Sequence, residues 1–168
     1  NYVRDLDLDT ASAMVTYRIE RTTYLRHYFV SYPDNVFVGR IEKETKKPAE
    51  EDEKKKSKEE PKPDPKLSFE AYVVSEQKGK AIAEGDTIFL QGTVTANKGL
   101  NGEDGKDKNN MKYGCAVKFI PTGGQITALE DGRIKITDAE SVVIIMSLAT
   151  DYINTFPVFS DGSDPLEK

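Results

Sequence analysis

The chain has 168 residues, a length that suits one domain with a substantial core. Its net charge of -5 and pI of about 5.1 argue against a nucleic-acid partner bound through phosphates, and no apolar run approaches the roughly 18 residues of a membrane span. A single cysteine, Cys115, and a single histidine, His27, exclude an internal disulfide and a cysteine–histidine zinc set, so we predict no metal site and no cofactor.

Aspartates and leucines alternate near the amino terminus, in the stretch RDLDLDTASAMVTY at 4–17. Because side chains of a strand alternate between its two faces, we expect the aspartates on the solvent face and the leucines on the hidden face. These residues are Asp5, Asp7 and Asp9, and Leu6 and Leu8. A calcium site is the alternative, although Thr10 stands where an EF-hand loop has glycine.

Three further segments before residue 43 have the alternating apolar pattern of strands. The first places Val15, Tyr17 and Ile19 on one face. The predicted strands are 14–20, 23–32 and 35–42, with a turn at Pro33-Asp34 between the last two.

A charged segment, EKETKKPAEEDEKKKSKEEPKPDPK, interrupts this pattern at 42–66. Nine of its 25 residues are lysine and nine are acidic, so that its net charge is zero, and Ala49 is its one apolar side chain apart from four prolines. Such a composition cannot bury enough apolar surface to offset the entropy of ordering. We therefore predict a disordered insertion at 43–66 between two strands.

The remaining sequence again predicts strands, separated by glycine, asparagine and aspartate turns. The segment 141–150 is almost wholly apolar, which favours a central strand covered on both faces. We predict an all-β fold, an antiparallel β-sandwich occupying 1–168 as a single domain, with a carboxy-terminal tail at 161–168. The predicted strands are 66–76, 86–95, 111–121, 132–138 and 141–150.

Two motif lines in the amino-terminal part resemble the amino-terminal β-domain of glycoside hydrolase family 95. The first is Y-x-R-x-L-D-L-D-T-A-x-A-x-V-x-Y at 2–17, and the second is R-x-x-F-x-S-x-P-D-x-V-x-V-x-R at 26–40. The later segments NMKYGCAVKFIPTGGQI and VVIIMSLATDY are similar to a strand pair and an apolar strand of that domain. Asn110, where glycine is usual, and the length of the 43–66 insertion depart from the family pattern.

The resemblance implies a super-sandwich domain of a larger, inverting enzyme that is an α-L-fucosidase or α-L-galactosidase. It implies that the acid and base act from a separate (α/α) barrel, which would be this domain's partner within the same polypeptide. No position here matches the family's catalytic motifs, so we predict no catalytic residue in the chain. We expect a bacterial parent protein that is secreted or periplasmic, and a fragment that alone is not an enzyme.

Several other residues suggest sites, each with a simpler interpretation. The loop 99–110, GLNGEDGKDKNN, is a conceivable calcium loop, but a hairpin connection is the simpler reading. His27 is predicted to be structural rather than a general base, and Cys115 to be a small buried hydrophobe.

Aromatic residues after the last predicted strand could contact a glycan or pack against a neighbouring domain. They are Tyr152, Phe156 and Phe159. An autonomous carbohydrate-binding module therefore remains the alternative to a structural domain of a hydrolase.

Overall fold

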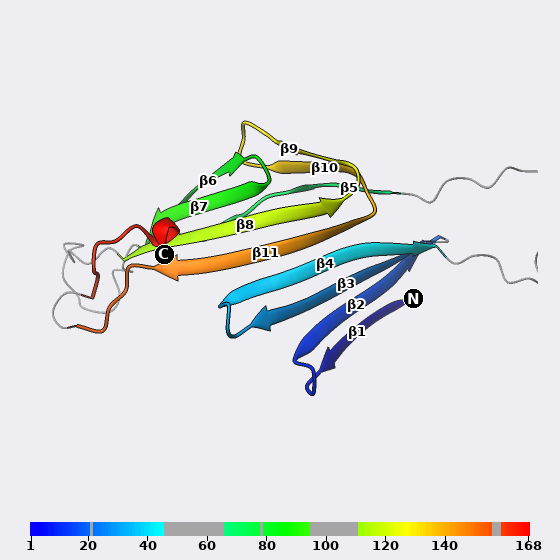
Figure 1. The fold of residues 1–168 in the computed structure, drawn as a ribbon, viewed down its shortest axis with the longest axis horizontal. Coiled ribbons are helices and arrows are strands. Elements are labelled where there is room, and N and C mark those ends of the chain that lie inside the picture. The colour runs from blue at the N-terminus through cyan, green and yellow to red at the C-terminus, as the bar shows by residue number, and fades with distance from the viewer. Residues whose placement is uncertain (21, 46–65, 78, 95–110, 156–158) are drawn as a thin grey trace, which may run out of the picture.

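A computed structural model describes residues 1–20, 22–45, 66–77, 79–94, 111–155 and 159–168 (Figure 1). The described residues form eleven β-strands and a short 3-10 turn, η2 (Pro165–Glu167). The strands are β1 (Tyr2–Asp7), β2 (Ser12–Ile19), β3 (Thr22–Ser31), β4 (Val36–Thr45), β5 (Leu67–Ala71), β6 (Gly79–Glu84), β7 (Thr87–Thr93), β8 (Lys112–Thr122), β9 (Gln125–Ala128), β10 (Ile134–Ala139) and β11 (Ser141–Thr150).

The strands make two antiparallel sheets of unequal size. The large sheet has eight strands in the order β1-β2-β3-β4-β11-β8-β7-β6, and the small sheet has three in the order β5-β10-β9. In Figure 1, β1 to β4 and β6 to β8 lie on opposite sides of β11. The sheets form a sandwich, which confirms the predicted all-β class.

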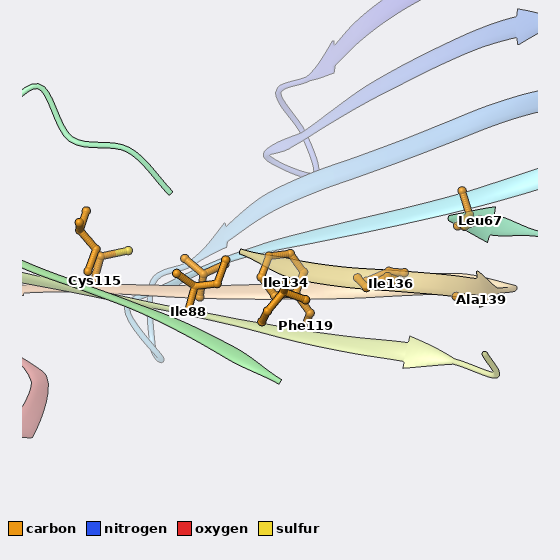
Figure 2. Close-up of a cluster of buried hydrophobic side chains, with 10 residues drawn as sticks. Leu67, Ile88, Cys115, Phe119, Ile134, Ile136 and Ala139 are labelled. Atoms are coloured by element: carbon orange, nitrogen blue, oxygen red, sulfur yellow. The ribbon is translucent and has the colours of Figure 1, made fainter. Parts of the chain in front are cut away.

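The core lies between the small sheet and one face of the large sheet, which we call the inner face. Alternate residues of β8 point into it, including Cys115 and Phe119, and Ile88 of β7 joins them. From the small sheet, Ile134 and Ile136 of β10 are fully buried against these side chains (Figure 2). This packing follows from strand alternation, because every second residue of each strand is apolar.

The small sheet covers part of the inner face, where Tyr24 of β3 still packs against the core, and it stops short of β1 and β2. At one side, the Lys43 ammonium of β4 donates to the carbonyl of Lys66, directly before β5. At the other side, Gly132 lies so close to β6 that a Cβ there would be 2.7 Å from the carbonyl oxygen of Ala81. The small sheet therefore spans from β4 to β6, and the large sheet continues beyond it.

The expectation for the first strand was wrong in one respect. Leu6 is 65% exposed and Leu8 82%, so neither leucine is hidden. All of β1 is exposed, since the small sheet does not reach it, and the strand ends at Asp7. Asp5 and Asp7 do share a face, whereas Asp9 lies in the turn that follows.

Most other predicted strands lie close to their observed bounds, and two observed strands, β6 and β9, were missed. β11 is central in the large sheet, yet it is not covered throughout, because Leu148 is 59% exposed. Residues 43–45 of the expected insertion continue β4, and 46–65 lie outside the described residues, as do 99–110. In the described part of the chain, no helix is long and apolar enough to cross a membrane.

Candidate functional site: uncovered faces of the large sheet

The inner face of β1 to β4 continues the core-facing surface beyond the small sheet. Strand register places its residues opposite one another, because Tyr2, Tyr17, Tyr24 and Lys43 are successive cross-strand partners. The face contains no carboxylate, although the chain as a whole has a net charge of -5. Its residues are Tyr2, Arg4, Leu6, Ala13, Val15, Tyr17, Ile19, Thr22, Tyr24, Arg26, Tyr28, Val30, Phe37, Gly39, Ile41 and Lys43.

Four residues of this face form a row that we call the tyrosine–cation row. The rings of Tyr17 and Tyr24 stack with centroids 4.9 Å apart. The Arg26 guanidinium lies 5.2 Å from the centroid of Tyr17, and the Lys43 ammonium 5.3 Å from that of Tyr24. Each cation–π contact contributes about 0.5–1 kcal/mol. Stacking covers one face of each ring, and each tyrosine also contacts a cation.

Arg26 is the charged residue of this row that has a buried donor without a partner among the described residues. Its Nη2 donates to the Tyr17 hydroxyl at 3.0 Å, while its Nε is buried and has no hydrogen-bond partner among the described residues. Burial opposes the charge, but the hydroxyls of Tyr17 and Tyr28 outweigh it and raise the pKa of Arg26. A buried donor without a partner costs about 1–3 kcal/mol.

Two other arginines of the chain, Arg40 and Arg133, form ion pairs with carboxylates. Arg40 pairs with Glu42 at 2.8 Å, and Arg133 pairs with Glu70 and Asp131. Among the described residues, Arg26 forms no ion pair with a carboxylate. A guanidinium has five donors arranged for bidentate binding, so Arg26 can take a carboxylate from elsewhere.

The opposite, outer face of the large sheet carries short apolar rows that are flanked by Arg40 and Lys118. Cross-strand register joins Phe29 to Val38 and Val38 to Ile145, and a second row joins Val143 to Ile120. Phe29 and Ile120 are 41% and 43% exposed. Exposed apolar side chains on neighbouring strands suit contact with another protein layer.

His27 and Cys115 have different environments, since one is exposed and the other is buried. His27 is exposed on the outer face, opposite Met14 and Arg40, with the ring of Phe29 6.4 Å away. Cys115 is buried in the core, where burial raises the pKa of its thiol, so it stays a neutral apolar group.

The carboxyl-terminal segment is bound to the end of the large sheet through Asp151, a residue that sequence reasoning missed. Asp151 is 1% exposed, and its carboxylate accepts from the Lys112 backbone N–H at 2.8 Å and from the Ser160 hydroxyl at 2.5 Å. Pro165 and Leu166 then pack so close to β8 that a Cβ on Gly114 would lie 3.0 and 2.9 Å from them. A charged residue directly after an apolar strand was the available signal.

The predicted tail at 161–168 and two of the aromatic residues that precede it, Tyr152 and Phe159, are thus part of the fold. Lys168 donates to the Thr150 carbonyl and pairs with Asp161, and Gln91 donates to Asp164 at 2.8 Å. The rings of Tyr152 and Phe159 stack at 6.4 Å, and Phe156 lies outside the described residues.

The aspartates singled out near the amino terminus serve a turn. Asp7 accepts from the backbone N–H of Asp9 at 2.9 Å and of Thr10 at 3.3 Å. Hydrogen bonds from Thr10 lower the pKa of Asp7, and the bond from the Thr10 side chain has a larger effect than the bond from its backbone N–H. Among the described residues, no group of three or more histidines, cysteines or acidic residues is placed to hold a metal ion.

Comparison with known proteins gives two matches. Residues 1–155 match the family model described as "Glycosyl hydrolase family 65, N-terminal domain". The chain is also 22% identical over 181 aligned residues to "Alpha-L-fucosidase 2" of Arabidopsis thaliana, an alignment that covers 100% of this chain and 19% of the relative. The chain thus spans about a fifth of the length of that relative.

Proposed function

Since this chain belongs to the family of glycosyl hydrolase family 65 N-terminal domains, we propose that it is the non-catalytic β-domain of a longer glycoside hydrolase. The observation that carries the proposal is the family match over 1–155, which includes all eleven described strands. The proposed substrate is a glycan with a terminal α-linked L-fucose or L-galactose.

Two observations support the choice of substrate. The relative named alpha-L-fucosidase 2 aligns with the whole chain. The motif lines at 2–17 and 26–40 resemble the amino-terminal domain of glycoside hydrolase family 95, and we propose membership of that narrower family on the same ground.

The chemistry of the described carboxylates favours a structural role. Inverting hydrolysis needs a carboxylic acid with a raised pKa and a base about 6.5–9.5 Å from it. Here hydrogen bonds and cations instead lower the pKa of Asp7, Asp86, Asp131 and Asp161. Carboxyl groups of this kind stay ionised, which does not suit a catalytic acid, and each is engaged in a turn or an ion pair, so we propose that the acid and the base lie elsewhere in the polypeptide.

The proposed role of the domain is to pack against the catalytic part. The outer face of the large sheet, with Phe29, Val38, Ile120 and Ile145, offers the apolar surface for that contact. Burying such side chains contributes about 25 cal/mol per Å² of apolar surface. A catalytic barrel of the same polypeptide is the proposed occupant.

The test compares the full-length protein with the 168-residue chain. Full-length protein should release nitrophenol from 4-nitrophenyl α-L-fucoside or the corresponding L-galactoside, and the chain alone should release none. Fucosylated glycan bound by the chain alone, with no hydrolysis by the full-length protein, would favour a carbohydrate-binding module instead.

A substitution in the full-length protein tests the non-catalytic assignment of the first aspartates. Asp7→Asn should leave turnover within a few-fold of wild type, because the Asp7 carboxylate is engaged in a turn. A loss of roughly 1,000-fold with folding intact corresponds to about 4 kcal/mol of barrier and would place Asp7 among the groups that stabilise the transition state.

A further inference from the structure

The small sheet is the second layer of the sandwich, and it leaves part of the inner face of the large sheet uncovered. Among the described residues the small sheet ends at β5, whose outer edge lies on the β4 side, and the large sheet continues through three more strands. Val30 and Ile19, on the inner face of β3 and β2, are 68% and 55% exposed. Elsewhere on the same face, the residues that the small sheet covers form the core.

The charges of this surface indicate what chemistry would complete it. It carries Arg4, Arg26 and Lys43 and no acidic residue, while the outer face of the same strands carries both signs of charge, with Asp5, Asp7 and Glu42 as well as Arg18 and Arg40. Lys43 donates to a carbonyl of this chain, and Arg4 contacts Tyr2. Arg26, in contrast, is half-buried with no ion pair among the described residues.

We propose that a segment of the same polypeptide outside these 168 residues covers the inner face of β1 to β3, and that one of its carboxylates pairs with Arg26. The proposal rests on the proposed function, because it needs a longer polypeptide. The occupant extends the layer that the small sheet begins, with apolar side chains over Val30 and Ile19 and an aspartate or glutamate over Arg26.

Three observations favour this occupant over others. The surface is continuous with the core, which suits another protein layer. Tyr17 and Tyr24 stack on each other and each also contacts a cation, which leaves less ring surface on which a sugar could stack. The relative aligned with this chain has about four-fifths of its length outside the alignment, so there is ample chain to supply the layer.

The experiment uses zero-length cross-linking of the full-length protein with a carbodiimide, which joins an amine to a carboxylate. In Arg26→Lys, the new amine at position 26 should couple to an aspartate or glutamate outside residues 1–168 of the same polypeptide. The matched control is Arg40→Lys, whose amine should couple to Glu42 within the chain, since Arg40 pairs with it at 2.8 Å. Peptide mass spectrometry identifies both links, and neither readout depends on hydrolase activity.

A link from position 26 to a carboxylate within residues 1–168 would overturn the proposal. So would a link between two copies of the protein, which a mixture of differently isotope-labelled copies reveals. The absence of any link from position 26, while the Arg40→Lys control is cross-linked, would overturn it as well. If Arg26→Lys does not fold, hydroxyl-radical oxidation of the wild-type full-length protein decides. Val30 should then be as protected as Val142, which is 0% exposed in this chain. Oxidation of Val30 at the rate of a solvent-exposed valine would show an uncovered face and refute the inference.

Discussion

The contribution of the small sheet to stability can be tested at Ile136, which is 0% exposed on β10 between Phe69 and Ile126 of the neighbouring strands. Ile136→Ala removes three carbons from the core. At about 0.8 kcal/mol per carbon, the lost transfer energy is roughly 2.4 kcal/mol, and the remaining cavity raises the loss to about 3–4 kcal/mol.

Urea unfolding of the 168-residue chain measures this loss as a lower transition midpoint at unchanged slope. Ile19→Ala is the matched control, because Ile19 is 55% exposed on the uncovered inner face. It should cost about 1 kcal/mol or less in the chain alone. A loss below about 1 kcal/mol for Ile136→Ala, or equal losses for both variants, would refute the assignment of the core to the contact between the two sheets.

Three further predictions concern particular contacts. Gly124→Ala should cost at least about 2 kcal/mol in urea unfolding, because Gly124 has φ +68° and a Cβ there would lie 2.2 Å from the Thr137 carbonyl oxygen; a neutral result would contradict this turn geometry. Asp151→Ala should cost about 1–3 kcal/mol by the same assay, because it leaves the Lys112 N–H without its acceptor; unchanged stability would contradict the role of Asp151. Hydrogen bonds from Ser163 and Lys168 lower the pKa of Asp161, so its stabilising contribution is complete above about pH 4 and is lost as the pH falls through its folded-state pKa. Thermal midpoints of wild type and Asp161→Asn should therefore converge on acidification, and a constant difference would be the contrary result.

Local alternation was enough to predict the strands with strong β-formers. Val15, Tyr17 and Ile19 share a face as expected, and in the predicted strand 66–76 Leu67, Phe69 and Ala71 also lie on one face. β6, with the sequence GKAIAE, was missed because alanine, lysine and glutamate are weak strand formers. β6 forms because it pairs along its length with β7 across the two-residue turn Gly85-Asp86, a hairpin signal that the sequence does carry.

The candidate site was less accessible to sequence reasoning than the strands. The sequence drew attention to Asp7 and His27, whereas the structure gives Asp7 a turn and leaves His27 exposed on the outer face. Arg26 gave no signal, because an arginine in a strand is usually solvated. Its half-buried position beside Tyr17 depends on cross-strand register, which is set by the pairing of β2 with β3.

The sequence by itself determined the all-β class, the antiparallel strand pattern and the likeness to a glycoside hydrolase domain, because alternation and motif lines are properties of neighbouring residues. Tertiary structure alone decided which faces are covered. Leu6 and Ile136 are both apolar residues of strands, yet one is 65% exposed and the other 0%. The difference arises because β10 packs against the large sheet and nothing in the described residues covers β1, and burial depends on such contacts between segments distant in the chain.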